Sequence, residues 1–182
     1  VHDKTLRVQK LAEFIGAEAG LNAGDIRTLS RAARLSKADL VTQMVVEFPR
    51  LQGTMGKVYA LKSGESEAVS IAIEEHYRPT ASGGQLPETL TGAILSIADK
   101  LDTLCGCFSV GLSPTGASDP YAIRRQAIGV IQIMLNRDFA FSLAGIIETS
   151  LKIYDQFDPV HIRNTAVSVQ SFFQSRMSFL MA

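Results

Sequence analysis

Two carboxylates that stand three residues apart, Asp99 and Asp102, could carry acid–base or metal chemistry. On a helix turning 100° per residue, both fall beside an apolar line that includes Leu95, Leu101 and Cys105. They are therefore expected to be half-buried, where a carboxylate needs a cation, a hydrogen-bond donor or a metal ion. The spacing alone leaves two interpretations open, a structural ion pair and a metal site.

The histidines give a metal centre little support. His76 follows Glu74 and Glu75 in a helical pattern, but a lone histidine near a helix end more often caps or packs than binds a metal. His2 and His161 have no acidic neighbours that converge on them in the sequence. A metal site built on histidine is therefore not predicted from these residues.

The cysteines and glycines fit no nucleotide-binding or hydrolytic motif. Cys105 and Cys107 lack the two-residue spacing and the second pair of a zinc site, so core packing is favoured. No disulfide is expected between them, which favours a reducing, cytoplasmic compartment. The sequence contains no serine elbow, phosphate-binding loop or zinc-protease helix, and no strand precedes the glycine-rich turn around Gly111 and Gly116.

Basic residues cluster in one segment at helical spacing. Arg27, Arg31 and Arg34 follow steps of four and three, which places them on one face, and Lys37 lies one step further. A run of this kind is often only a solvated face. It is also the geometry that a track of nucleic-acid phosphates requires, so these four residues are candidate contacts.

A second basic pair, Arg124 and Arg125, is expected in the first turns of a helix. Their guanidinium groups could neutralise Asp99 or Asp102, or they could contact phosphate. The sequence leaves both roles open.

Helical signals dominate the elements that would position these residues. Asp119 before Pro120 and Asp158 before Pro159 are typical helix starts, because the carboxylate caps free N–H groups where proline needs no donor. No segment alternates with a period of two for long enough to indicate a strand. The sequence therefore predicts an all-α fold, with helices over residues 5–19, 25–48, 51–61, 65–77, 87–108, 120–136, 142–157 and 159–182.

Composition limits the classes of function. The 182 residues are 46% apolar, enough for one core, and 18 basic residues balance 18 acidic ones. A chain without net charge does not bind nucleic acids or membranes nonspecifically through its overall charge. Phosphate binding must therefore come from local clusters of Arg and Lys. No apolar run is long enough to span a membrane, which predicts a soluble protein. Because the chain begins with Val1, we expect it to be a piece of a longer protein.

Three long blocks have an order of residues that composition does not explain. They are LSKADLVTQMVVEFPRLQGTMGKVYA at 35–60, EEHYRP at 74–79 and ADKLDTLCGCFSVGLSPTGASDPYAIRR at 98–125. With Leu86 and Pro87 between them, these blocks resemble the β subunits of the bacterial heterotetrameric glycyl-tRNA synthetases. The resemblance is continuous from about Ala32 to Asn136, and the flanks match more loosely.

The resemblance implies an HD-domain-like helical bundle. Catalytic members of that fold hold a metal with a histidine, a His-Asp pair and a later aspartate. Asp39 matches the aspartate of the pair and Asp99 the later one, with His76 as a third possible ligand. Ala38 stands where the pair's histidine would be, so the resemblance implies a degenerate metal site with no bound metal and no catalytic residue.

The same resemblance implies a division of the chain. Residues 1–136 are expected to form the HD-like domain. Residues 137–182 are expected to form C-terminal helices that pack on it and lead into the tail of the β subunit.

The resemblance also implies a part in the ATP-dependent attachment of glycine to tRNA(Gly). In that family the α subunit holds the aminoacylation site, the subunits form an α2β2 heterotetramer, and ATP and Mg²⁺ act in the holoenzyme. This region would bind no cofactor and no membrane. It would position the tRNA acceptor arm through the candidate contacts Arg27, Arg31, Arg34, Lys37, Arg124 and Arg125.

Two other functions remain open at this point. One is a metal-dependent HD-type phosphohydrolase that uses Asp39, His76 and Asp99. The other is a structural scaffold between neighbouring domains, or a docking face for the α subunit.

Overall fold

The computed structural model describes residues 1–116 and 118–180, so Ala117 and the end of the expected last helix lie outside the described residues. The described part is helical, without a strand, as the sequence predicted. Its α-helices are α1 His2–Glu18, α2 Ala23–Leu35, α3 Gln43–Glu47, α4 Thr54–Lys62, α5 Glu67–Glu75, α6 Leu90–Ser109, α7 Ile123–Asn136, α8 Leu143–Lys152 and α9 Pro159–Leu180, with 3-10 turns at Ala38–Val41 and Pro49–Leu51.

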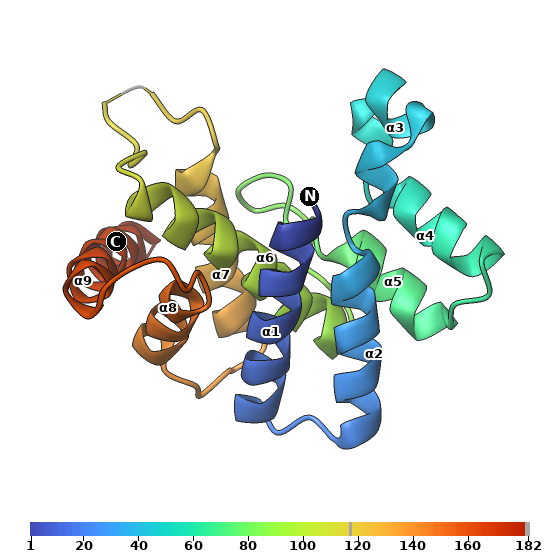
Figure 1. Cartoon of the computed structure of the whole chain (residues 1–182), viewed down its shortest axis with the longest axis horizontal. Helices are drawn as coiled ribbons and strands as arrows, with labels where there is room; N and C mark the ends of the chain where they lie inside the picture. The colour runs from blue at the N-terminus through green and yellow to red at the C-terminus, as the bar shows by residue number, and fades with distance from the viewer. Residues whose placement is uncertain (117, 181–182) are drawn as a thin grey trace.

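Helix α6 is the centre of the molecule. It packs against α1, α2, α5, α7, α8 and α9, and Figure 1 shows it crossing behind α1 with α3 to α5 on one side and α8 and α9 on the other. Every residue from Thr91 to Asp102 is buried because neighbours cover α6 on all sides. The two carboxylates that the sequence singled out are therefore inside the protein.

The start of α6 is fixed by side chains that accept backbone hydrogen bonds. The Thr89 hydroxyl accepts from the N–H of Gly92 at 3.0 Å, which makes Thr89 the N-cap. The buried Glu75 carboxylate accepts from the N–H groups of Glu88 at 2.8 Å and Thr89 at 3.0 Å. The helix therefore begins at Leu90. This start is three residues later than residue 87, where Pro87 predicted it.

The expected single helix over 25–48 is wrong. Helix α2 ends at Leu35, where the hydroxyl of Ser36 donates to the Ala33 carbonyl at 2.9 Å. A 3-10 turn and the short helix α3 follow. The break has a tertiary cause, because the Asp39 carboxylate accepts hydrogen bonds from the backbone N–H groups of Gly53 and Gly56. In a continuous helix the Asp39 side chain would lie too far from these groups to bind them.

The two Asp-Pro helix starts differ in their outcome. Asp158 caps α9 as predicted, with its carboxylate accepting from the N–H groups of Val160 and His161 at 2.8 and 3.0 Å. Asp119 also accepts from helical N–H groups, but they belong to residues 123 and 124, so α7 begins at Ile123 and not at the proline. The helix expected over 142–157 is shorter in the structure, because α8 ends at Lys152. The turn that follows α8 includes Asp155, whose φ is 56°.

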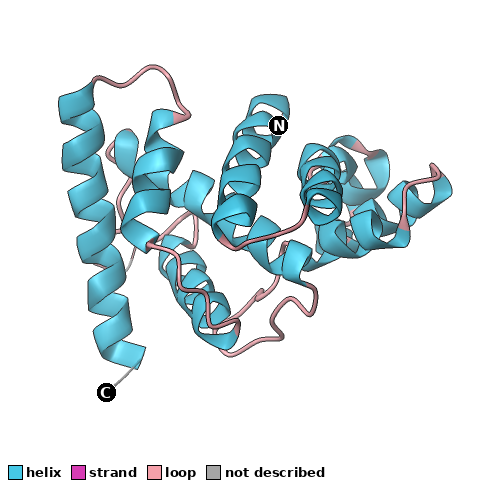
Figure 2. Cartoon of the chain, turned by 90° about the horizontal axis from the view of Figure 1, so that it is seen from below, coloured by secondary structure: helices cyan, strands magenta, loops and turns pink. Residues whose placement is uncertain are grey.

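One hydrophobic core runs through the molecule, from Val8 in α1 to Phe173 in α9. Helices α8 and α9 pack on α6, and α9 lies along one edge of the molecule in Figure 2. Cys105 is buried in this core as expected, and both cysteines are free thiols.

Among the described helices, none is both long enough and apolar enough to cross a membrane. The division into 1–136 and 137–182 stays a prediction.

Candidate functional site

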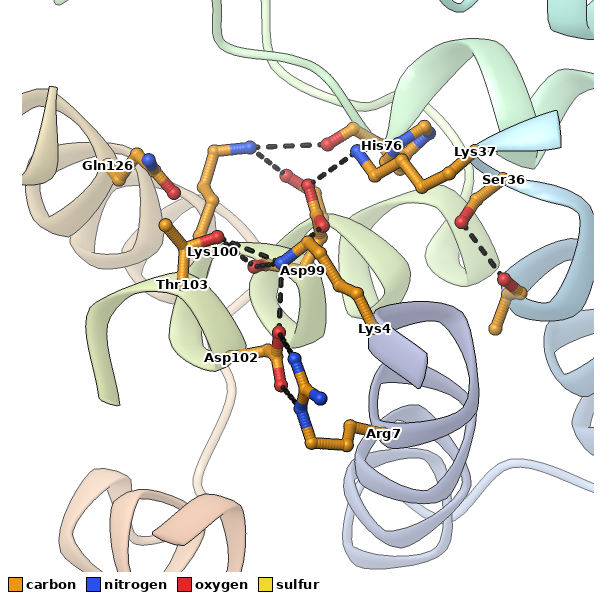
Figure 3. A network of polar contacts seen from close by, with 12 residues as sticks. Lys4, Arg7, Ser36, Lys37, His76, Asp99, Lys100, Asp102, Thr103 and Gln126 are labelled. Atoms are coloured by element: carbon orange, nitrogen blue, oxygen red, sulfur yellow. Dashed lines mark hydrogen bonds and ion pairs between the residues drawn. The ribbon is translucent and has the colours of Figure 1, made fainter. Parts of the chain in front are cut away.

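Asp99 is held between two lysines that come from distant parts of the chain. The Lys37 ammonium, which follows α2, donates to Asp99 Oδ2 at 2.9 Å, and Lys4 Nζ, from α1, lies 3.1 Å from Asp99 Oδ1. Lys37 Nζ also lies 2.7 Å from Nε2 of His76, the residue that follows α5. Figure 3 shows these side chains converging on α6. Three segments are thereby joined to the central helix through one carboxylate.

Asp102 extends the same network by one helical step. Its Oδ2 accepts from Lys4 Nζ at 3.0 Å, and its Oδ1 accepts from Arg7 Nε at 2.7 Å. Lys4 also donates to the hydroxyl of Thr103 at 2.9 Å. The two carboxylates are thus structural ion pairs, which is the first of the two interpretations that their spacing allowed.

Lys100 is a buried cation without a carboxylate partner. Its ammonium donates to Ser96 Oγ at 2.7 Å and to the carbonyls of Arg78 and His76 at 3.0 and 3.2 Å, and it forms no ion pair with any described residue. Burial lowers the pKa of Lys100 to about 8 because the charged form loses hydration. The ammonium therefore donates to neutral oxygens only, and the nearby charge of Asp99 offsets just part of the effect of burial.

The charges of the network set the protonation states of its members. Burial by itself would raise the pKa of Asp99, but the ammonium groups of Lys37 and Lys4 outweigh burial and lower it well below its usual value. Burial also lowers the pKa of Lys37, and nearby Lys4 lowers it further, so that the attraction of Asp99 does not fully compensate. The fold thus favours the ionised form of Asp99 and disfavours the charged form of Lys37.

His76 is neutral in this environment. Burial, followed by the charge of Lys37, lowers its pKa well below 6.5. An ammonium can only donate, so His76 Nε2 accepts from Lys37, and Nδ1 carries the proton and donates to the Ile73 carbonyl. The buried imidazole therefore acts as a fixed hydrogen-bonding link.

We expect the free energy of unfolding to fall as the pH drops below about 6.5, because the unfolded chain then binds a proton at His76 that the folded chain does not bind. The native pKa is depressed, so this contribution is complete above 6.5 and is lost at about 1.4 kcal/mol per pH unit below it. Urea unfolding at pH 7.5, 6.5 and 5.5 measures the slope. His76→Gln should lower the slope by one proton, and equal slopes would contradict a neutral His76.

Part of the network lines a cavity of about 490 Å³, namely Lys4, Lys37, Asp99, Lys100 and Thr103. We call these buried and half-buried lining residues the floor of the cavity and its exposed lining residues the mouth. Among the described residues that line it, Asp99 is the only acidic one. The basic lining comes from five separate places in the chain, namely Lys4, Lys37, Arg50, Lys100 and Arg125. Lys37 and Lys100 are buried, whereas Arg50 and Arg125 are exposed. Positive charge therefore gathers at this cavity although the whole chain has no net charge.

The predicted basic face of α2 is only partly as expected. Arg27, Arg31 and Arg34 are exposed and line a shallow hollow between α1 and α2. Arg31 is already paired, since Glu65 accepts from its Nε at 3.1 Å. Lys37 does not share this face, because the helix ends at residue 35 and the lysine turns into the buried network. Its phosphate contact, like those of the three arginines, stays a prediction.

The two arginines of α7 also separate. The guanidinium of Arg124 donates to the Gly116 carbonyl at 2.8 Å, while Arg125 reaches the cavity. Neither forms an ion pair with Asp99 or Asp102 among the described residues, so the suggestion that they neutralise these carboxylates is wrong. Lysines and an arginine from other elements take that role.

The three residues expected at the degenerate HD positions do not form one ligand set. Asp39 Oδ2 accepts from the N–H groups of Gly53 and Gly56 at 2.6 and 3.2 Å, and Ala38 is exposed. Within the described part of the chain, no three His, Cys, Asp or Glu side chains are grouped so that they could hold a metal ion. The space between His76 and Asp99 is bridged by the Lys37 ammonium. These residues therefore do not fit a divalent metal.

Sequence reasoning missed four members of the site: Lys4, Arg7, Arg50 and Lys100. Lys100 had a detectable signal, because it stands between two aspartates in a segment whose apolar residues occupy every side of the helix. The other three lie in segments with no pattern that points to Asp99 or Asp102. Their roles depend on which helices pack on α6.

Comparison with known proteins identifies the family. The family model described as glycyl-tRNA synthetase beta subunit matches residues 1–182, the whole chain. The glycine–tRNA ligase beta subunit of Desulforapulum autotrophicum is 52% identical over 181 residues, which cover 100% of this chain and 26% of the relative. The beta subunit of Myxococcus xanthus is 50% identical over 151 residues, which cover 83% of this chain and 21% of the relative.

The chain thus spans about a quarter of the length of the curated relatives that it matches. The match extends through the helices that build the cationic cavity and through the flanks that resembled the family only loosely. On this basis the chain belongs to the glycyl-tRNA synthetase beta subunit family.

Proposed function

We propose that this chain is part of the β subunit of a glycine–tRNA ligase and supports the attachment of glycine to tRNA(Gly) by binding phosphates of the tRNA acceptor arm. The observation that carries the proposal is the cavity whose lining holds five basic side chains and one carboxylate in a chain without net charge. Family membership supplies the substrate class.

This role needs no catalytic residue in the chain. Arginine and lysine contacts to phosphate position an RNA without reading its sequence, and A-form helices are met mainly through shape and backbone. Alignment of two reactants can remove several kcal/mol from an activation barrier. We propose that the aminoacylation site lies in an α subunit, that ATP and Mg²⁺ act there, and that two copies of each subunit assemble.

We further propose that the helices retain the arrangement of an HD domain whose metal position has been lost. Lys37 supports this view, because its ammonium lies between His76 and Asp99, where a second positive ion would be repelled. Asp39 is committed to backbone N–H groups. A metal-dependent phosphohydrolase is therefore not proposed.

A scaffold function is the second candidate, and a surface near α3 favours it. Four large apolar side chains in this segment are exposed, namely Val41, Met44, Val46 and Phe48. Contiguous exposed apolar groups are typical of surfaces that other chains or domains cover. This surface and a tRNA contact at the cavity are compatible with each other.

Removal of positive charge should weaken tRNA binding by the intact ligase. Two double variants test this, Arg27→Gln with Arg34→Gln on α2 and Arg50→Gln with Arg125→Gln at the cavity. Loss of phosphate contacts should weaken affinity about tenfold and reduce the slope of log K against log salt by roughly 0.7 to 0.9 per contact.

Arg163→Gln provides the control, because Arg163 is an exposed arginine of α9 that does not line the cavity. Its affinity and salt slope should equal those of the wild type. If both double variants also keep the wild-type affinity and slope, these arginines do not bind tRNA and the scaffold function is preferred.

A further inference from the structure

We propose that the cavity above α6 is a binding pocket for a phosphate monoester, the terminal phosphate of an RNA chain or of a nucleotide. The proposal deepens the proposed function and rests on it only where the RNA end is taken as the source of the phosphate. It stands on three observations: the excess of positive charge, the hydrogen-bond donors left at the mouth, and the size of the cavity.

The charge around the cavity is unbalanced. Its lining holds one carboxylate, Asp99, and five cationic side chains, namely Lys4, Lys37, Arg50, Lys100 and Arg125. The nearby charges of Arg7 and Asp102 offset each other in an ion pair, and Asp39 is the other carboxylate close to Lys37. Lys37 and Lys100 are only 6% and 5% exposed, so water screens their charges poorly. An anion in the cavity would relieve this excess, and the buried ammonium groups would attract it strongly.

The donors that could bind an anion directly stand at the mouth. The ammonium groups on the floor are already occupied, as Figure 3 shows for Lys4, Lys37 and Lys100. Arg50 and Arg125, in contrast, make no side-chain hydrogen bond or ion pair with any described residue, and both line the cavity. Tyr77 also lines it, and its buried hydroxyl has no partner among the described residues.

A phosphate monoester fits these features better than other anions do. It carries a charge of about −1.5 to −2 at pH 7 and three acceptor oxygens, whereas a carboxylate or an internal phosphodiester carries one charge. Guanidinium groups bind phosphate through parallel hydrogen bonds, which suits two free arginines. The volume of about 490 Å³ accommodates a phosphate with part of its nucleoside but not a duplex.

The experiment uses the intact ligase, with uridine 5′-monophosphate as the nucleotide probe and uridine as its control without phosphate. Calorimetry should detect saturable binding of the monophosphate and none of uridine. Arg50→Gln with Arg125→Gln should weaken that binding at least tenfold, whereas Arg163→Gln should leave it unchanged. Both arginines at the mouth are exposed, so the variant should keep the wild-type melting temperature.

The second arm compares tRNA that has a 5′-monophosphate with the same tRNA after phosphatase treatment. An affinity about tenfold higher for the phosphorylated tRNA, abolished by the double variant, assigns the pocket to the RNA end. Nucleotide binding without this difference assigns it to free nucleotides. The pocket is refuted if neither probe shows binding that the double variant weakens, even while variants on α2 still impair tRNA binding. If the monophosphate binds but no variant affects tRNA, the proposed function fails instead.

Discussion

Replacement of Asp99 by asparagine should destabilise the protein by about 3–5 kcal/mol at pH 7, because it removes the negative charge that the buried Lys37 ammonium shares with the half-buried Lys4 ammonium. Lys4 would keep Asp102 as a partner, but Lys37 would keep only uncharged partners, the His76 imidazole and the face of the Tyr77 ring 4.0 Å away. Asparagine has nearly the same shape as aspartate, so packing is little changed. The loss therefore reports the uncompensated buried charge of Lys37.

Urea unfolding of the 182-residue chain, followed by circular dichroism, measures this effect. Glu148→Gln is the matched control, since Glu148 pairs with Lys152 at 2.8 Å on an exposed surface and its removal should leave the unfolding midpoint almost unchanged. If Asp99→Asn shifts the midpoint no more than Glu148→Gln does, the ion pairs around α6 do not contribute as inferred.

Replacement of Lys37 by methionine should restore much of the stability lost in Asp99→Asn, by about 2 kcal/mol. The double variant removes the ammonium that has lost its partner and fills its place with an apolar chain of similar length. In the wild-type background the same replacement should cost less than Asp99→Asn, because Asp99 keeps Lys4 and because burial already disfavours the charged form of Lys37. A four-protein cycle of unfolding free energies gives the coupling.

Arg34→Met in the Asp99→Asn background distinguishes local rescue from a general effect of lost positive charge. Arg34 is exposed on α2, three residues before Lys37, and makes no ion pair with a described residue. It should restore nothing. Equal rescue by both replacements, or none by Lys37→Met, would contradict a direct coupling between Lys37 and Asp99.

Helices whose boundaries depend on local contacts could be predicted from the sequence. Asp158 caps α9 because its carboxylate needs only the two N–H groups that follow it. Boundaries set by distant groups could not be predicted. Asp39 accepts from the N–H groups of Gly53 and Gly56, so the helix expected over 25–48 is interrupted. Glu75 accepts from the N–H of Glu88, so the helix expected from residue 87 begins later.

The candidate site was predicted only in part for the same reason. Periodicity along one helix places Asp99 and Asp102 beside an apolar line, and it correctly indicates that both need a partner. It does not identify the partner. The arginines of α7 were nearest in the sequence among the candidates, yet the partners are Lys4, 95 residues from Asp99, and Lys37, 62 residues from it.

The all-α class, the cap of α9 and the family can be read from the order of residues alone, because they depend on neighbouring residues or on long contiguous blocks. The packing of the helices, in contrast, is what takes Lys37 away from the arginine face of α2 to bridge His76 and Asp99, and what brings five cations to one cavity. The difference arises because an ion pair acts over a short range and requires its atoms to lie within about 4 Å of each other. That proximity arises only when α1, α2 and α5 pack on α6.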